Sequence, residues 1–243
     1  MLSREERERY DRQIMIRGFG LGGQGRLRKA KVFIAGAGGL GCAAATYLTA
    51  AGVGMIRIVD HDRVELSNLN RQVLHWAEDI GKRKADSAVQ KLGGLNPGVK
   101  IEPIGETITG ANISQLVAGF DLIVDAMDNL PTRYLLNKVA LEKNIPLFHG
   151  AVYGFEGRAT TIIPGETACL WCVYRGVVTK GKFPVIGVTP AVIGSIQAAE
   201  VIKYIVGIGQ LLTNRLLVYD GLNMKFTEFK LKRDPNCEHC GKK

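Results

Sequence analysis

The 243-residue sequence contains no long apolar run. None of its hydrophobic stretches reaches the roughly 18 residues that a membrane-spanning helix requires. The first residues, MLSREERERYDRQ, are highly charged and lack the apolar centre of a secretory signal peptide. We therefore expect a soluble cytoplasmic protein that does not bind membranes.

Acidic residues are the minority, yet the basic excess forms no continuous stripe. Lys and Arg total 32 against 23 Asp and Glu, a net charge of +9. This balance favours an anionic partner: nucleic acid, nucleotide phosphates or an acidic protein. The basic residues are scattered apart from short clusters at 26–31 and 82–84, and no aromatic residues are interleaved with them. We therefore expect no nucleic-acid partner.

Cysteine is scarce, and four of the five cysteines form two C-x-x-C pairs. Without a secretory signal, this spacing favours a metal over disulfides. Four thiolates suit tetrahedral Zn²⁺ and leave no open coordination position, so we expect a structural zinc site. Its ligands would be Cys169, Cys172, Cys237 and Cys240. Free thiols or a redox pair are the alternative. His239 is expected to be a bystander, and Cys42 a small buried hydrophobe.

Strand-like and helix-like segments alternate through the first 150 residues, which predicts an α/β fold with a doubly wound, mainly parallel, Rossmann-like sheet. After about residue 150, apolar and polar residues alternate in segments typical of antiparallel strands. A mostly apolar segment at 189–207 predicts a buried helix. We expect a single domain, 1–243. It would comprise a helical arm (1–30, ending in a glycine-rich connection), a nucleotide-binding core (31–150) and a C-terminal part with antiparallel strands and zinc cysteines (151–243).

The segment KVFIAGAGGLG carries the spacing G-x-G-x-x-G directly after an apolar run. Gly36 would permit a tight turn, Gly38 the approach of a phosphate, and Gly41 the close packing of helix on strand. Asp60 ends the next predicted strand, where a carboxylate can accept hydrogen bonds from ribose hydroxyls. The pattern predicts a nucleotide without saying which one. A glycine-rich packing turn is the alternative.

The residues beyond Asp60 favour a triphosphate over a hydride carrier. Arg71 and Lys84 supply cations, and Asp128 follows a predicted strand at the sheet edge where open parallel sheets bind ligands. Cations and an acid beside a phosphate-binding turn suit a triphosphate with Mg²⁺. Alternatively, Arg71 and Lys84 are solvated surface charges, and Asp128 only caps the following helix. Asp62 is expected to be a loop or Asx-turn residue.

Seven blocks of the sequence resemble one known family. They are RYDRQI, GAGGLGCAAATYLTAAGVG, VDHDRVELSNLNRQVLH, GKRKADSA, DAMDN, CLWC and CEHCG, in that order between residues 9 and 241. The sequence is identified as a member of the MoeB/ThiF family of sulfur-carrier adenylyltransferases, relatives of the ubiquitin-activating enzymes. Within the family it is most similar to the molybdopterin-synthase branch.

The resemblance implies a set of ATP-site residues. They are Gly38, Gly39 and Gly41 under the phosphates, Asp60 at the ribose, Asn68, Arg71 and Lys84 at the triphosphate, and Asp128 at Mg²⁺. It also implies that Arg12 reaches into the neighbouring protomer's ATP site, and hence a homodimer. The implied catalytic residues are Arg71, Lys84, Asp128 and Arg12. The implied cofactors are ATP, Mg²⁺ and Zn²⁺.

The implied reaction is adenylation of a small ubiquitin-like sulfur carrier (MoaD/ThiS-like) that ends in Gly-Gly. The carrier's terminal carboxylate would attack the α-phosphate of ATP, giving an acyl-adenylate and pyrophosphate for molybdopterin or thiamine synthesis. Positive groups would offset the repulsion between carboxylate and phosphate. A sulfurtransferase or cysteine desulfurase could then supply the sulfur.

The sequence departs from the family in one loop. Many relatives carry a further cysteine after the first zinc pair, but here Phe183 stands near that place and the loop has no thiol. We therefore expect no covalent intermediate through a loop cysteine. Lys180 and Lys182 could guide an acidic carrier tail or be ordinary surface lysines. His75 and His149 are expected to be structural, since neither has a visible triad partner.

Other functions stay open at this stage. The ATP site could activate another carboxylate: a small molecule, a peptide or a tRNA-linked amino acid. The Cys₄ site, which we associate with the sulfur-carrier branch, argues against the tRNA version. A carrier-binding scaffold with a silent nucleotide site is a third hypothesis, and the set of Asp60, Arg71, Lys84 and Asp128 argues against it. Hydride transfer is disfavoured.

Overall fold

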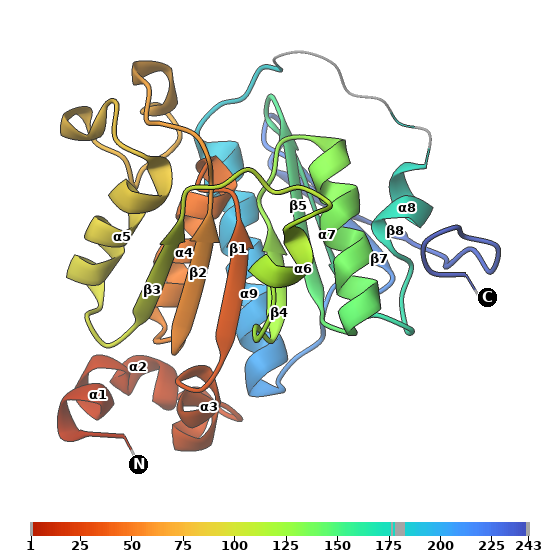
Figure 1. The fold of residues 1–243 in the computed structure, drawn as a ribbon. Helices are drawn as coiled ribbons and strands as arrows, with labels where there is room; N and C mark the ends of the chain where they lie inside the picture. The colour runs from red at the N-terminus through yellow and green to blue at the C-terminus, as the bar shows by residue number, and fades with distance from the viewer. Residues whose placement is uncertain (1, 176, 178–182, 242–243) are drawn as a thin grey trace.

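The computed structural model describes residues 2–175, 177 and 183–241. In this part of the chain the strands form one eight-stranded sheet in the order β3-β2-β1-β4-β5-β6-β7-β8 (Figure 1). The strands from β3 to β5 run parallel, and β6, β7 and β8 add antiparallel pairings. The strands are β1 Lys31–Ala35, β2 Met55–Val59, β3 Lys100–Ile104, β4 Leu122–Asp125, β5 Leu147–Tyr153, β6 Glu156–Ile162, β7 Arg215–Asp220 and β8 Lys225–Lys230.

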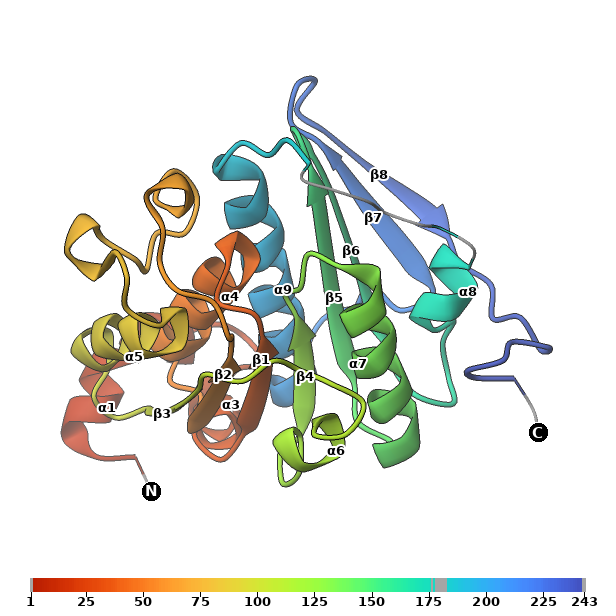
Figure 2. The same ribbon diagram turned by 45° about the horizontal axis from the view of Figure 1, so that its top comes forward.

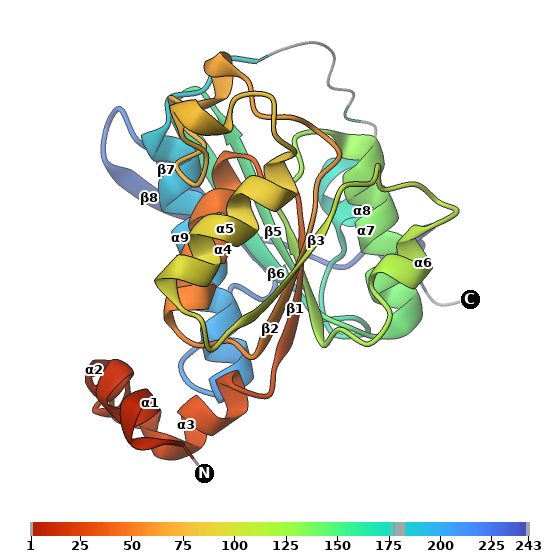
Figure 3. The same cartoon turned by 60° about the vertical axis from the view of Figure 1, so that its left-hand side comes forward.

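Helices cover both faces of the sheet, as Figure 3 shows: α4, α5 and α9 lie on one face, and α6, α7 and α8 on the other. The longest, α9, corresponds to the predicted buried helix and packs against α4, β5 and β6. The helices are α1 Arg4–Arg9, α2 Asp11–Ile14, α3 Gly20–Leu27, α4 Gly39–Ala50, α5 Lys84–Leu95, α6 Ile113–Leu116, α7 Leu130–Lys143, α8 Leu170–Tyr174 and α9 Val188–Val206, with short 3₁₀ helices η1 Leu66–Asn68 and η2 Ala77–Asp79. The predicted fold class is confirmed.

The glycine-rich segment at 17–25 is not the connection that its composition predicts. Most of it lies in α3, which packs beneath the end of α9 (Figure 1). A Cβ atom at Gly23 would lie 2.9 Å from Val206 Cγ1 and 3.2 Å from the ring of Phe19. Close packing therefore requires glycine here and overrides the poor helix propensity of this residue.

The parallel strands end at one edge of the sheet, and this edge positions the candidate site. Because β1 lies between β2 and β4, the connections after β1 and β4 leave in opposite directions, which creates the crevice where open sheets bind ligands. The loop 61–83 rises above this edge, and α1, α2 and α3 lie at the opposite, amino-terminal edge (Figures 1 and 3). Figure 2 shows the C-terminal tail beyond β8 close to α8.

Candidate functional site

The glycine turn between β1 and α4 is fixed by close backbone contacts. Gly36 has φ +100°, and a Cβ atom there would lie 2.7 Å from the carbonyl oxygen of Ala126. A Cβ atom at Gly41 would overlap the carbonyl oxygen of Gly36. Gly39 packs on α9, because its Cβ atom would lie 2.8 Å from Pro190 Cγ. Packing therefore explains Gly36, Gly39 and Gly41.

Gly38 is the least crowded of these glycines: a Cβ atom there would have Gln72 Nε2, at 3.8 Å, as its nearest neighbour. Gly38 is the N-cap of the 12-residue helix α4 and provides no side-chain cap. The first backbone N–H groups of the helix therefore remain free to donate to an anion. The carboxylate of Asp60 braces the turn: its Oδ2 accepts from the backbone N–H of Ala37 at 2.7 Å. The turn and Asp60 thus lie together.

Lys84 is not a solvated surface charge. It begins α5, is 6% exposed, and its Nζ lies 2.7 Å from Asp62 Oδ2. Asp62 is therefore more than the turn residue that the sequence predicted. Its own backbone N–H is held by Asp60 Oδ1 at 2.8 Å, so these three residues are linked beside the glycine turn.

Arg71 lies half-buried on the loop 61–83. Its Nη1 donates to the carbonyl oxygen of Ser67 at 2.8 Å and to Asn70 Oδ1 at 3.1 Å. Among the residues that the structure describes, no carboxylate forms an ion pair with it. Asn68 is buried, and its Oδ1 accepts from the backbone N–H of Glu65, so this part of the side chain shapes the loop.

A buried carboxylate anchors the same loop to α5. Asp79 has no exposed side-chain surface, and its oxygens lie 2.8 Å from Lys82 Nζ and 2.9 Å from Lys91 Nζ. It also accepts from the backbone N–H of Trp76, whose ring lies under Lys91 Nζ. Burial alone would raise the pKa of Asp79, but the hydrogen bonds from Lys82 and Lys91 hold that pKa well below its usual range.

Asp128 lies exposed after β4 and does not cap α7. The cap is its neighbour Asn129, whose Oδ1 accepts from the backbone N–H of Thr132 at 2.9 Å. A cavity of about 490 Å³ opens beside Asp128. Six of its lining residues are Asp128, Arg133, Tyr153, Glu156, Arg158 and Phe183. The rings of Phe183 and Tyr153 stack with their centroids 6.4 Å apart, so an aromatic pair forms part of the wall near the position where the resemblance led us to expect a loop cysteine.

His149 has partners that the sequence did not reveal. In the fully buried side chain, Nδ1 lies 2.6 Å from Asp125 Oδ2, and Nε2 lies 3.1 Å from the hydroxyl of Tyr174. Arg133 lies 3.7 Å from the same carboxylate oxygen. Burial lowers the pKa of His149 against the opposing effect of Asp125. Asp125 is thus a partner that was not visible in the sequence, and these contacts join β4, β5 and α8 around His149.

His75 and Cys42 lie under the glycine turn. The ring nitrogens of His75 lie 2.9 Å from the carbonyl oxygen of Ala37 and 3.0 Å from Ser87 Oγ, which ties the turn to α5. Cys42 has no exposed surface, and burial raises the pKa of its thiol to about 12. It therefore stays protonated and behaves as the small buried group that was expected.

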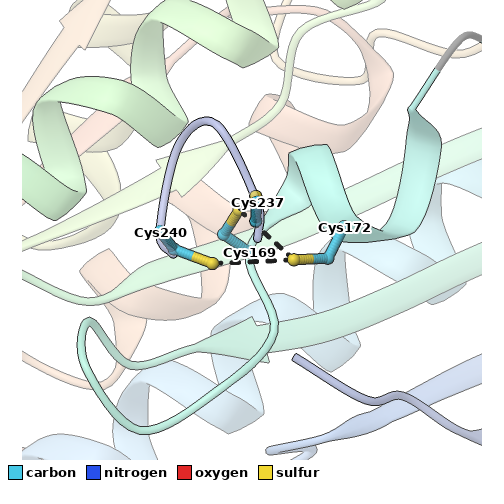
Figure 4. A group of neighbouring side chains, drawn as sticks. All are labelled: Cys169, Cys172, Cys237 and Cys240. Atoms are coloured by element: carbon cyan, nitrogen blue, oxygen red, sulfur yellow. Dashed lines mark hydrogen bonds between the residues drawn. The ribbon is translucent and has the colours of Figure 1, made fainter. Parts of the chain in front are cut away.

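The four paired cysteines converge, as Figure 4 shows; we call Cys169, Cys172, Cys237 and Cys240 the cysteine cluster. Cys169 Sγ lies 3.9 Å from Cys172 Sγ and 3.7 Å from Cys237 Sγ, and Cys172 Sγ lies 3.5 Å from Cys240 Sγ. A tetrahedral zinc ion with Zn–S bonds of about 2.3 Å holds its sulfurs about 3.8 Å apart. The cluster therefore fits zinc.

A second layer of side chains supports the cysteine cluster. Asn137 on α7 is fully buried; its Oδ1 accepts from the backbone N–H of Leu170, and its Nδ2 lies 3.0 Å from His239 Nδ1. One side chain therefore contacts both cysteine segments. His239 is not among the clustered ligands, but it stacks on Trp171 at 4.6 Å and so helps hold the tail.

Arg12 is a predicted site residue, but within one chain the structure does not place it near the other predicted ATP-site residues. It lies exposed on α2, at the amino-terminal edge of the sheet, and the glycine turn lies at the carboxyl edge (Figure 1). The arm is anchored there, since Gln13 Nε2 donates to the carbonyl oxygen of Ala51 and the hydroxyl of Tyr10 accepts from Asn96. Lys180 and Lys182 lie outside the described residues.

A family model of the ThiF family matches residues 10–239. The chain belongs to the ThiF family. The predicted family is thereby confirmed, and this ThiF-family protein can be set beside its relatives. Within the described residues, none of its helices combines the length and apolarity needed to cross a membrane.

Three relatives resemble this ThiF-family protein over nearly its whole length. It is 45% identical over 240 residues to the SAMP-activating enzyme E1 of Haloferax volcanii, covering 96% of this chain and 88% of the relative. It is 42% identical to the sulfur carrier protein adenylyltransferase of Thermus thermophilus (98% and 92% covered). It is 40% identical to the molybdopterin-synthase adenylyltransferase of Escherichia coli (99% and 98% covered). These relatives confirm the predicted class of enzyme, an adenylyltransferase.

A solved structure has the same fold. The crystal structure of Escherichia coli MccB with MccA-N7isoASN superposes with a TM-score of 0.87 at 25% identity, covering 97% of this chain and 75% of MccB. The fold therefore extends to a relative with more distant sequence.

Proposed function

We propose that this protein adenylates the C-terminal glycine carboxylate of a ubiquitin-like sulfur carrier, using ATP and releasing pyrophosphate. One observation carries the proposal: the uncapped start of α4, Asp60, buried Lys84 and exposed Asp128 all lie at the carboxyl edge of the parallel sheet. The relative named as a sulfur carrier protein adenylyltransferase, 42% identical, supports the choice of acceptor.

The positive groups would allow the carrier's carboxylate to approach the α-phosphate of ATP, although both are negatively charged. A carboxylate that approaches the α-phosphate is repelled by the negative charge of the nucleotide. Arg71 has a guanidinium that no described carboxylate neutralises, so it can face a triphosphate without giving up an acid partner, whereas Lys84 holds its ammonium out of solvent against Asp62. Approach of a phosphate to Lys84 would compete with Asp62.

Asp128 is the residue suited to hold Mg²⁺. Its carboxylate is exposed at the cavity and is not used as the cap of α7, and Mg²⁺ in nucleotide sites is usually bound by one or two carboxylates together with phosphates. When bound, the ion would neutralise charge on the phosphates. The role of Asp128 would be to fix the position of the triphosphate relative to the cavity.

The cavity beside Asp128 would receive the carrier's tail. Its wall includes the stacked pair Tyr153 and Phe183, and the guanidinium of Arg158 pairs with Glu156 at 2.6 Å. A tail of small residues such as Gly-Gly could pass between these groups to the phosphate. Because no thiol lies in this wall among the described residues, the proposed chemistry ends at the acyl-adenylate, which a separate sulfur donor would attack.

The site would be completed by a second copy of the chain, with Arg12 entering from the partner. Two groups of exposed apolar side chains support a homodimer: Met15, Ile16 and Leu21 on the arm, and Leu66, Val73, Trp76 and Ile80 on the loop that carries Arg71. If each arm covered the partner's loop, both groups would be buried and Arg12 would lie near Arg71 of the other protomer.

A second candidate substrate is the terminal carboxylate of a peptide. MccB, which shares this fold, is solved with MccA-N7isoASN, so the fold is not confined to proteins named for sulfur carriers. ATP–pyrophosphate exchange distinguishes the candidates. Exchange that requires a carrier ending in Gly-Gly supports the proposal, and exchange only with a small acid or short peptide supports the alternative. Nucleotide binding without exchange under all conditions would indicate a scaffold and refute both.

A further inference from the structure

Gln72 lies directly over the glycine turn, yet its side chain makes no hydrogen bond. The residue is 4% exposed, and its Oε1 is shielded from solvent without a donor among the described residues. Buried side-chain amides in folded proteins nearly always have partners, because leaving them unpaired costs free energy. The orphan Oε1 is an acceptor, which an anion would not satisfy. The donor Nε2 also lacks an acceptor among the described residues, and this end of the amide is the one that can serve a ligand.

The surroundings identify where that partner would lie. Nε2 of Gln72 is the nearest heavy atom, at 3.8 Å, to the position that a Cβ atom on Gly38 would occupy. Gly38 is the N-cap of α4, where backbone N–H groups lack a side-chain acceptor. The donor Nε2 and the unpaired helix N–H groups thus face one small space, and an anion placed there would accept hydrogen bonds from both.

The loop holds Gln72 rigidly in this position. Its backbone N–H donates to the carbonyl oxygen of Asn68 at 3.0 Å, and its carbonyl oxygen accepts from the N–H of His75 at 2.9 Å. His75 in turn bonds the carbonyl oxygen of Ala37 within the glycine turn. The amide is therefore positioned before any ligand arrives, so little conformational freedom is lost on binding.

Other orphan polar atoms within the described residues do not share this setting. Thr49 lies near the far end of α4, and Trp171 belongs to the surroundings of the cysteine cluster. Gln197 has a free Oε1, but its Nε2 donates to the carbonyl oxygens of Asp125 and Phe148. Gln72 is the one that lies beside the start of α4.

We propose that Gln72 is a nucleotide-binding residue whose side-chain amide donates a hydrogen bond to a phosphate oxygen of the bound nucleotide. The inference rests on the proposed function, because the ligand is taken to be ATP. It adds a neutral donor to the cations Arg71 and Lys84. Because the amide is neutral, it would not attract phosphates from a distance as a cation does. It would instead fix the position of one phosphate group on the glycine turn.

The test compares Gln72→Met with the wild type, each as the whole 243-residue chain. Methionine has a similar length and no strong hydrogen-bonding group. Calorimetric titration with ATP should show binding weakened about 10-fold or more, the loss typical of one hydrogen bond to a charged group. Titration with adenosine should be unchanged within about 2-fold, because the nucleoside has no phosphate. Gln115→Met, which alters an exposed glutamine on α6, is the matched control and should bind ATP normally.

A second readout separates a ligand contact from a structural one. If the amide has no partner in the nucleotide-free protein, Gln72→Met should keep or raise the melting temperature without nucleotide and reduce the rise that ATP produces. A lower melting temperature without nucleotide would overturn the inference, as would ATP affinity equal to wild type or an equal loss for adenosine. Gln72→Glu, with the same shape and a negative charge, should weaken ATP binding further than Gln72→Met. Failure of the wild-type protein to bind ATP would refute the proposed function instead.

Discussion

Subunit complementation between Arg12 and Arg71 tests the proposed dimer site directly. The structure separates these residues within one chain: α2, which carries Arg12, lies at the amino-terminal edge of the sheet, and the loop 61–83, which carries Arg71, lies above the carboxyl edge (Figure 1). The five residues of β1 alone span about 17 Å between the two edges, at about 3.3 Å per residue. This distance exceeds the reach of any side chain, so Arg12 can serve a nucleotide site only in a partner.

The expected magnitude follows from symmetry. Arg12→Ala and Arg71→Ala should each lower ATP–pyrophosphate exchange by about 10²–10³-fold, the scale for one preorganised charge-stabilising group. When the two variants are mixed 1:1 and allowed to exchange subunits, about half of the dimers are heterodimers. Each heterodimer has one site with both arginines intact, so the mixture should recover about a quarter of wild-type activity.

The assay mixes separately purified variants, verifies heterodimers with two affinity tags, and measures carrier-dependent exchange. Arg7→Ala, on the same arm and exposed, is the matched control and should be nearly as active as wild type. If heterodimers form and the mixture is no more active than its components, Arg12 does not act in trans. A protein that stays monomeric at micromolar concentration during turnover would refute the dimer itself.

Three further predictions concern the scaffold. Chelation should remove about one zinc per chain, lower the melting temperature and slow carrier-dependent exchange; retention of full stability without zinc would show that the cysteine cluster does not hold the tail. Asp79→Asn should destabilise the protein by about 3 kcal/mol at pH 7, as denaturant titration can measure, because it removes the carboxylate 2.9 Å from the buried ammonium of Lys91 and leaves only Glu78, at 3.7 Å, to pair with it. Because the pKa of Asp79 is lowered on folding, its stabilisation is present at neutral pH and is lost as pH falls below about 4, so wild type and variant should converge in acid. Cys42 should resist alkylating reagents at pH 8 in the folded protein, which mass spectrometry can verify; rapid modification would contradict its burial and its raised pKa of about 12.

The sequence predicts those parts of the site that depend on local pattern. A glycine turn needs only its own neighbours, because Gly36 requires a positive φ and Gly41 must pass the carbonyl oxygen of Gly36. The two C-x-x-C pairs are likewise recognisable from their spacing alone. In contrast, the glycine-rich composition of 17–25 predicts a connection, whereas most of this segment is helical. The close contact of Gly23 with Val206 favours the helix although glycines favour turns.

Contacts across the sheet are harder to predict. Asp125 and His149 meet because β4 and β5 pair in a register that places them side by side, and a shift of one residue would separate them. The sequence offers little hint of this pair, because Asp125 ends β4 whereas His149 is only the third residue of β5. The pair of Lys84 with Asp62 likewise depends on a β-bridge between Arg63 and Arg83, which no local pattern indicates.

The cysteine cluster and the candidate nucleotide site are connected through one helix, which explains why zinc removal should affect activity. α7 begins beside Asp128 at its cap Asn129, and Asn137 lies eight residues further, about 12 Å along the helix axis. Asn137 contacts both cysteine segments, so the cluster fixes the middle of α7. A second link runs from Tyr174, at the end of α8, through His149 to the strand that precedes Asp128. Loss of zinc would free both links, and the carboxylate at the cavity would lose its fixed position although no cysteine touches it.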